Sequence, residues 1–375
     1  MSALDLGPLN AFAAENDLPT AIVESVENEL ADRGSPGICY PANDAGRAEE
    51  FVDRTHKDLR YVPAWNRWLV WAGHYWRPDE DGEITRLVVK HSRQLMREAA
   101  EIPDEIQRGF AIKAAVALGN AGRIQNTLEL AKCDSRVVAS HRAMDGNPFL
   151  LGVQNGVIEL RTGTFRTGKR EDLITKLAGV TYQKSASCPR WLAFLNEVLQ
   201  GDAELIGYLQ KLVGYTLTGD VSAQMFPFLY GTGKNGKSVF TEILQKLLGD
   251  YGRRAPQSLL TESPNGREPS GEIARLQGAR LVIGSETTEG GRLAESRIKD
   301  LTGGDTMTGR FLYCESFDFK PALKLWMFGN QPLRKQWVAP FLRDADGERN
   351  KPNPSPYPFI GAANGRFVIA EHPEL

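Results

Sequence analysis

The spacing of apolar and polar residues divides the chain into a helical first half and a second half in which strands alternate with helices. Apolar residues three or four positions apart predict amphipathic helices at residues 44–59, 83–102, 104–119 and 122–132. Short apolar runs predict buried strands at residues 225–230, 279–284 and 323–329. Further helices are expected at 190–199, 202–217 and 239–248. Such alternation is typical of an α/β fold.

Two hairpins are predicted before the α/β part. Four tryptophans lie within residues 65–76 and precede a turn at 77–82, and this aromatic alternation predicts the first hairpin. These tryptophans, Trp65, Trp68, Trp71 and Trp76, are expected mainly in a core, with base stacking as the alternative. Asn155 and Gly156, between two apolar runs, predict the second hairpin within residues 149–160.

The octapeptide Gly-Thr-Gly-Lys-Asn-Gly-Lys-Ser at residues 231–238 carries the strongest chemical signal in the chain. It fits the phosphate-binding loop G-x-x-x-x-G-K-[ST] at every fixed position, between a predicted strand and a predicted helix. Lys237 is expected to reach the β and γ phosphates of ATP, and the Ser238 hydroxyl to bind Mg²⁺. A chance glycine-rich turn is the alternative. The expected ATP-binding residues are Gly231, Thr232, Gly233, Lys234, Asn235, Gly236, Lys237, Ser238 and Val239.

Polar residues follow the two later strands. Glu286 comes after the strand at 279–284, where a carboxylate can hold Mg²⁺ and polarise an attacking water. Asn330 follows the strand at 323–329 and is expected to sense the γ phosphate. Glu286, Lys237 and Asn330 are therefore the predicted catalytic residues. A surface glutamate and a turn asparagine are the alternatives.

Composition limits the class of protein. The 375 residues suffice for two domains, and 25% charged and 41% hydrophobic residues are ordinary globular values. The net charge of −2 requires that any nucleic acid be bound by local basic positions. Four cysteines without a C-x-x-C pair argue against a zinc ribbon or a disulfide framework. With no membrane span or signal peptide apparent, a cytoplasmic location in a bacterial host is expected.

Residues 41–331 resemble the phage and plasmid primase-helicase family, whose motor belongs to helicase superfamily three. The resemblance rests on residues 231–238, Ser285–Gly290, Ile298–Asp305, Arg310, Phe319–Pro321 and Gly329-Asn330, and upstream on residues 155–163 and 208–219. It implies an AAA+-like P-loop ATPase core preceded by a mainly α-helical adaptor domain with small β-hairpins. The implied domains are a leader or linker at 1–40, the adaptor at 41–185, the motor at 186–331 and a divergent proline-rich tail at 332–375.

The resemblance also implies a hexameric ring that threads single-stranded DNA through its centre. The DNA contacts are expected from a hairpin within residues 306–320, with Arg310, Tyr313 and Lys320 as candidates and Lys299 just before it. A basic ring around a pore is compatible with a net-acidic chain. For each of these residues alone, a solvated surface side chain is the alternative.

The sequence departs from the family in two respects. No primase module is apparent, so a separate primase is an expected partner. After Gln331 the match ends, and the tail has seven prolines in 44 residues, as in a replaced or frame-shifted end. Arg343 is the only candidate for the arginine finger, the residue that a ring neighbour inserts into the ATP site.

The sequence therefore predicts an ATP-dependent DNA helicase or translocase core for replication of a phage, prophage or plasmid, with slow hydrolysis because of its divergent tail. The alternative is a truncated, catalytically weak protein that binds ATP and DNA and modulates an intact helicase.

Overall fold

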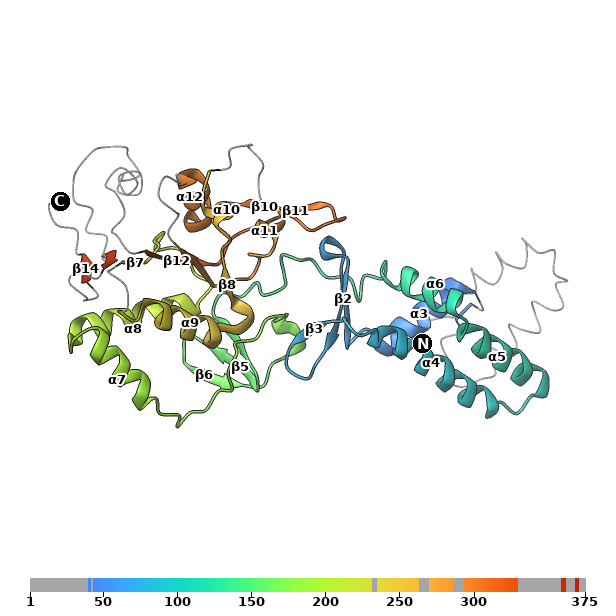
Figure 1. Cartoon of the computed structure of the whole chain (residues 1–375). Coiled ribbons are helices and arrows are strands. Elements are labelled where there is room, and N and C mark those ends of the chain that lie inside the picture. Colours follow the sequence, from blue (N-terminus) through green and yellow to red (C-terminus); the bar gives the residue numbers. More distant parts are fainter. Residues whose placement is uncertain are drawn as a thin grey trace, which may run out of the picture.

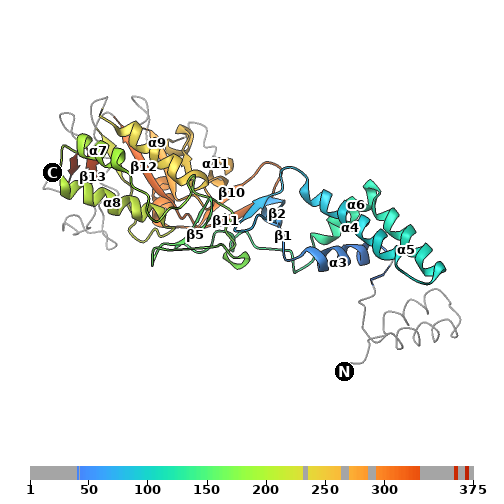
Figure 2. The same cartoon turned by 90° about the horizontal axis from the view of Figure 1, so that it is seen from below.

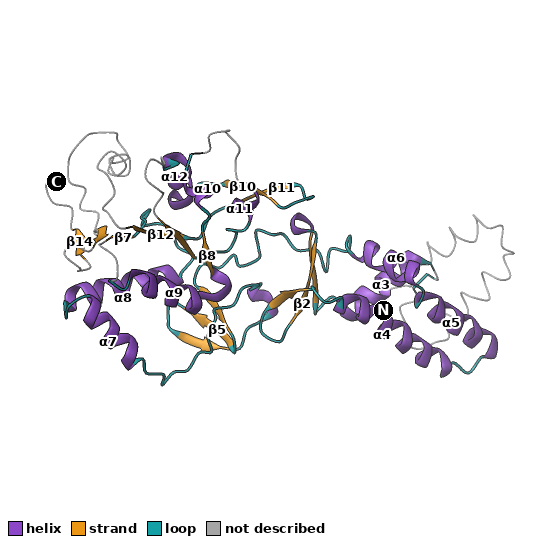
Figure 3. Cartoon of the chain, in the orientation of Figure 1, coloured by secondary structure: helices purple, strands orange, loops and turns teal. Residues whose placement is uncertain are grey.

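A group of helices lies at one end of the molecule and a parallel sheet at the other, with a small antiparallel sheet between them (Figures 1 and 2). This computed structural model describes residues 40–41, 43–230, 235–262, 270–285, 293–329, 359–361 and 368–370. One end is purely helical, whereas the other mixes helices and strands (Figure 3). The structure thus has the helical N-terminal part and the α/β C-terminal part that the sequence predicts.

The helical end consists of α3 (Asp44–Thr55), α4 (Glu83–Ala100), α5 (Glu105–Leu118) and α6 (Ala121–Ala131). Side chains accept hydrogen bonds from the first turns of three of them: Asn43 from the Gly46 N–H, Asp104 from the Gln107 N–H, and Asp79 from the Glu83 and Ile84 N–H groups. Phe51, Val88 and Ala115 contribute to one shared apolar core. Among the helices in the described part of the chain, none is both long and apolar enough to cross a bilayer.

The predicted tryptophan-rich hairpin belongs to a three-stranded antiparallel sheet of β1 (Leu59–Val62), β2 (Arg67–Trp71) and β3 (Trp76–Pro78). Trp76 is fully buried, and Trp71 packs edge-on against it at 5.2 Å between ring centroids. These two side chains agree with the interpretation as core. Trp65, in the short helix η1 (Pro63–Trp65), packs against the same cluster and also against the core of the C-terminal part.

The second hairpin is present with its loop one residue earlier than the Asn-Gly pair suggests. Strands β4 (Leu150–Val153), β5 (Gly156–Glu159) and β6 (Thr164–Arg166) form an antiparallel sheet, and Val153 is paired with Gly156. Gln154 and Asn155 therefore form the loop. Gly156 therefore does not serve as a turn residue. Position 156 needs glycine because a Cβ atom there would lie 2.6 Å from the Arg166 carbonyl oxygen, which is too close.

Four parallel strands form the central sheet of the C-terminal part. They are β7 (Phe228–Tyr230), β8 (Gly252–Arg254), β9 (Leu281–Ser285) and β12 (Lys324–Gly329), in the order β7-β12-β9-β8. Because side chains alternate along a strand, Ile283 and Trp326 face one hydrophobic core, while Val282 and Met327 face another. Both faces of the sheet are thus buried, as expected for parallel strands.

Helices cover both faces of this sheet (Figure 1). On one side lie α7 (Pro189–Val198), α8 (Ala203–Leu217) and α9 (Lys237–Leu248), and on the other α10 (Gln257–Leu260), α11 (Ser270–Ala274) and α12 (Glu295–Gly303). The core on the first side includes Leu151, Val153 and Ala178. Residues before position 186, where the sequence predicts the start of the motor domain, therefore pack in the same core as the parallel sheet.

Two short strand pairs and two single turns complete the described structure. Strands β10 (Met307–Arg310) and β11 (Ser316–Phe319) form an antiparallel hairpin, and β13 (Phe359–Gly361) pairs with β14 (Val368–Ala370). Two single turns, η2 (Arg170–Asp172) and η3 (Gly249–Tyr251), lie in connections.

Two buried cations hold α8 at the amino end of the sheet. Lys324, the first residue of β12, donates through Nζ to the carbonyl oxygens of Thr218 and Asp220, and Arg280 donates to that of Leu217. These carbonyl groups lie at and just after the C-terminus of α8, where cations are favourable. Burial nevertheless lowers the pKa of Lys324 from its ordinary value to about 7, and the nearby Arg280 adds to this shift.

We expect Lys324 to make stability depend on pH. Its folded pKa of about 7 lies below the ordinary value of 10.5, so between these pH values the unfolded chain binds more protons and folding stability rises with pH. Below pH 7 both states hold the proton and this contribution is constant. The slope is at most about 1.4 kcal/mol per pH unit.

Urea unfolding from pH 7 to pH 9 measures this contribution as the difference in free energy of unfolding between the unaltered chain and Lys324→Met. Lys211→Met, at an exposed position on α8, is the control. A difference that stays constant over this range would mean that Lys324 keeps its ordinary pKa in the folded state.

Candidate nucleotide-binding site

The carboxyl ends of three neighbouring strands meet at one edge of the sheet. Strand β12 lies between β7 and β9, with Gly329 paired to Tyr230 and Phe328 paired to Ser285. Adjacent strands are about 4.8 Å apart. The next residues in the sequence are Gly231, Glu286 and Asn330, which start the three predicted motifs. In open α/β sheets, this edge is where ligands bind.

The second half of the predicted phosphate loop lies at the start of α9. Gly236 precedes the helix with a φ of 86°, and Lys237 is its first residue. A Cβ atom at position 236 would lie 2.8 Å from Val198 Cγ1 and 3.2 Å from the Phe194 ring, both on α7. Position 236 therefore requires glycine both for its left-handed backbone and for the close approach of α7.

Lys237 and Asn235 form a compact donor group in front of this helix. The Lys237 side chain is buried, and its Nζ donates to Asn235 Oδ1 at 2.9 Å. The Asn235 Nδ2 atom is also buried, and it has no hydrogen-bond partner among the described residues. A buried N–H without a partner costs free energy. An anion at this helix N-terminus would supply the missing acceptor, so the residues present fit a phosphate group.

Aromatic side chains fix the position of α9. Phe240 stacks on Trp191 of α7 at 5.5 Å and lies 5.6 Å from Trp326 of β12. The Trp326 indole N–H donates to Thr216 Oγ1 of α8 at 3.0 Å. The sequence analysis did not identify α7 as part of the site. The sequence feature that could have indicated it is the pair Trp191 and Phe194, two aromatic residues three positions apart on one helix.

The remaining predicted ATP-site residues are only partly described. Ser238 and Val239 are exposed in the first turn of α9. Gly231, Thr232, Gly233 and Lys234 lie outside the described residues, as do Glu286, Asn330 and Arg343. Their assignments stay predictions. Within the described ranges, no group of three or more His, Cys, Asp or Glu side chains is placed to bind a metal ion.

The hairpin expected within residues 306–320 is the β10–β11 pair. Tyr313 at its tip is 93% exposed and has a φ of 61°. Arg310 is exposed and donates through Nε to the Cys314 carbonyl oxygen at 3.2 Å. Lys320, just after β11, and Lys299 on α12 are also exposed. The structure thus places Arg310, Tyr313 and Lys320 on or beside one hairpin, with side chains accessible to solvent.

The N-terminal part braces this hairpin. His141 Nε2 is 3.0 Å from the Asp318 carbonyl oxygen, and the His141 ring lies edge-on to Phe317. Gln277 links this contact to the tryptophan-rich sheet, because it donates to the His141 carbonyl oxygen and accepts from the Trp65 indole N–H. No sequence pattern predicted this connection.

Two domain families match the chain. Residues 48–200 match the family described as "D5 N terminal like", and residues 229–347 match a family of unknown function, DUF5906. The first covers the helical part and the small sheets, and the second covers most of the parallel sheet.

Several viral proteins are similar to part of this chain. "Putative helicase L207/L206" of Acanthamoeba polyphaga mimivirus is 33% identical over 195 residues, which are 51% of this chain and 20% of that protein. "Putative helicase 121R" of Invertebrate iridescent virus 3 is 27% identical over 54% of this chain and 22% of that protein. "Putative primase C962R" of African swine fever virus (isolate Tick/Malawi/Lil 20-1/1983) is 30% identical over 46% of this chain and 18% of that protein.

The chain spans about a fifth of the length of these curated relatives. Among solved structures, the A-form apo structure of the NrS-1 C-terminal region aligns with 78% of this chain and 57% of that chain, at 9% identity and a TM-score of 0.45. That likeness is too weak to carry an argument about the fold. The match of residues 48–200 to the "D5 N terminal like" family, together with the similarity to viral proteins named as putative helicases and a putative primase, supports a relation to the primase-helicase family of phages and viruses.

Proposed function

We propose that this chain is the motor part of an ATP-driven DNA helicase or translocase that serves replication of a phage, prophage or plasmid. In this proposal it binds ATP and Mg²⁺ at the carboxyl edge of the parallel sheet and acts on single-stranded DNA. Several copies, six by resemblance to superfamily-three helicases, form a ring. The proposed activity is inferred from the residues of the candidate site and not from the viral relatives, because the chain matches only part of the length of those proteins.

The observation that carries the proposal is the register of β12 with its two neighbours. Tyr230 lies opposite Gly329 and Ser285 lies opposite Phe328, so the three strands end within one residue of the same level and the loops that follow start at neighbouring strand ends. Three motifs separated by up to about a hundred residues in sequence thereby begin at one site. A chance glycine-rich turn would not require the acid strand and the asparagine strand to be its neighbours.

The described residues support a role in holding a triphosphate. Lys237 supplies a positive charge in front of α9, and Asn235 presents a buried N–H donor beside it. The N-terminus of α9 adds backbone N–H donors and the positive end of its dipole. Mg²⁺, when bound, neutralises charge on the β and γ phosphate oxygens. Ser238 and Glu286 are the residues proposed to hold it.

Hydrolysis is assigned to residues that follow the other two strands. Glu286, after β9, would accept a proton from the attacking water. Asn330, after β12, would contact the γ phosphate from the strand that lies between β7 and β9. In a ring, a neighbour would supply an arginine, for which Arg343 is the candidate. A separate primase is a proposed partner.

Replacing Lys237 with alanine should weaken ATP binding about tenfold to a hundredfold, because a hydrogen bond to a charged group is worth about 1.5–3 kcal/mol. Isothermal titration calorimetry with a slowly hydrolysed ATP analogue and Mg²⁺ measures the dissociation constant. Lys246→Ala, an exposed lysine in the last turn of the same helix, is the matched control. An unchanged dissociation constant in Lys237→Ala would remove Lys237 from the site.

Glu286→Gln should retain ATP binding and lose at least about a hundredfold in turnover, because the amide keeps the shape of the side chain but cannot accept the proton. Steady-state phosphate release, with and without single-stranded DNA, measures turnover. Glu289→Gln, three residues further along, is the control. Equal turnover in Glu286→Gln and the unaltered chain would contradict the assignment.

Arg310→Ala and Lys320→Ala should weaken binding of single-stranded DNA regardless of its sequence and leave ATP binding intact, because these side chains are proposed to contact phosphates. Each substitution should also reduce the slope of log K against log salt concentration by about 0.7. Fluorescence anisotropy with labelled oligonucleotides of several sequences tests both effects. Loss of affinity for one sequence alone would argue against a phosphate contact.

A further inference from the structure

Two adjoining cavities lie beside the β10–β11 hairpin, away from the start of α9. The larger has a volume of about 450 Å³ and is bounded by η1, α11 and the hairpin tip. The smaller, of about 210 Å³, lies between β8 and α11. Glu272 and Arg275 line both cavities, so the two adjoin one another beside α11 and are treated as one groove. We call this surface the arginine groove.

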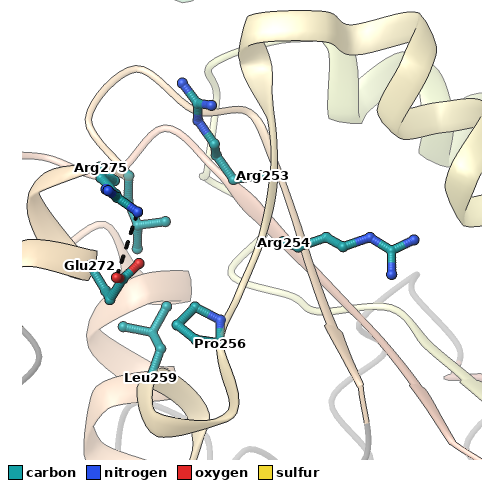
Figure 4. A pocket seen from close by; sticks show the side chains of 7 residues that line it. Arg253, Arg254, Pro256, Leu259, Glu272 and Arg275 are labelled. Atoms are coloured by element: carbon teal, nitrogen blue, oxygen red, sulfur yellow. Dashed lines mark ion pairs between the residues drawn. The ribbon is translucent and has the colours of Figure 1, made fainter.

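Basic side chains line the whole length of this groove. Arg67 lies at the end formed by the tryptophan-rich sheet, Arg275 in the middle and Arg253 on β8 at the other end. Figure 4 shows Arg253 on the same side of β8 as Arg275 and Glu272, whereas Arg254 extends to the other side of the strand. Arg254 is already engaged there, since its Nε donates to Gln245 Oε1 of α9 at 2.9 Å.

The positive charge of the groove is not balanced by its own residues. Glu272 is the one acidic residue among those that line the two cavities. It forms a loose, exposed ion pair with Arg275 at 3.7 Å, an arrangement that contributes little. Arg67 and Arg253 are exposed and form no ion pair with any described residue. The groove therefore carries an excess of positive charge that suits an anionic ligand.

Aromatic side chains form the wall of the larger cavity. Trp65 and Phe311 line it from opposite elements, η1 and the hairpin, and both are half-buried. The Trp65 indole N–H is held by Gln277 Oε1 at 2.8 Å, and Phe311 stacks on Phe317 at 5.5 Å. Both rings are thus fixed in place at a cavity that opens to solvent. Tyr313, fully exposed at the hairpin tip, lies one residue beyond Leu312, which also lines the cavity.

We propose that the arginine groove is a path for single-stranded DNA, which continues from the hairpin along α11 to β8. Arg67, Arg253 and Arg275 contact the phosphates, and Trp65 and Phe311 offer faces for the bases. Single-stranded nucleic acid requires this combination of a basic groove and fixed aromatic rings. The inference rests on the proposed function and extends it, because it adds the N-terminal sheet to the DNA-binding surface.

The proposal gives the N-terminal part a physical role in the motor. Trp65 and Arg67 belong to the tryptophan-rich sheet, yet they border the same cavity as the hairpin. A strand in the groove would contact both parts at once.

Charge reversal tests the groove directly. In the full-length chain, Arg67→Glu and Arg253→Glu should each weaken binding of a fluorescent 20-nucleotide oligo-dT at least about tenfold and reduce the salt slope, since each replaces a phosphate contact with a repulsion. Lys211→Glu, the same charge change at an exposed position on α8, should bind as the unaltered chain does. Thermal unfolding of each variant establishes that it is folded.

Photocrosslinking locates the strand without relying on a loss of affinity. Oligo-dT that contains 5-iododeoxyuridine should crosslink to the peptides that hold Trp65 or Phe311, and Arg253→Glu should reduce the yield. Crosslinks confined to peptides elsewhere in the chain would overturn the proposal.

The outcomes separate this inference from the proposed function. If Arg310→Ala weakens DNA binding while Arg67→Glu and Arg253→Glu do not, the groove is not the path, although the helicase proposal stands. If the groove variants change the mass of the assembly in light scattering but not the affinity for DNA, the groove is a contact between subunits and the inference is wrong. If the unaltered chain binds no single-stranded DNA, the proposed function itself is contradicted.

Discussion

The parallel pairing of β12 between β7 and β9 is the interaction on which the candidate site depends. It brings together the ends of three strands whose following residues are far apart in the sequence, and its register sets those ends within one residue of the same level. The side chains of the same strands alternate between two apolar cores, so a shift of one residue would move each side chain into the opposite core, where it does not fit its neighbours. Hydrophobic packing therefore holds the register that the chemistry needs.

Two sets of contacts connect this sheet to its surroundings. At the carboxyl edge, Phe240 and Trp326 fix α9, while α7 approaches Gly236 so closely that no side chain fits. At the amino edge, Arg280 and Lys324 bind the last carbonyl groups of α8. Two buried cations without a buried carboxylate are costly. Their backbone acceptors offset part of that cost, so α8 is held at the amino edge of the sheet and α9 at its carboxyl edge.

Local patterns in the sequence predicted the elements well, but not their spatial relations. The start of α9 follows from the glycine-lysine motif, and the strands at β7, β9 and β12 follow from apolar runs. Strand order depends on contacts between distant residues, so no local pattern could reveal that β12 lies in the middle. For the same reason the sequence missed α7 beside Gly236 and the contact between Trp65 and Gln277. The hairpin loop consists of Gln154 and Asn155, one residue earlier than the Asn-Gly pair predicts, because Gly156 already pairs with Val153 in the sheet.

An experimental structure with Mg²⁺ and a non-hydrolysable ATP analogue would test the central claim most directly, because it locates the nucleotide relative to the sheet. The account predicts that the phosphates lie at the start of α9, against Lys237 and Asn235, with the metal ion between Ser238 and the residues that follow β9. A nucleotide bound elsewhere, or an α9 N-terminus that remains empty at saturating analogue, would contradict it.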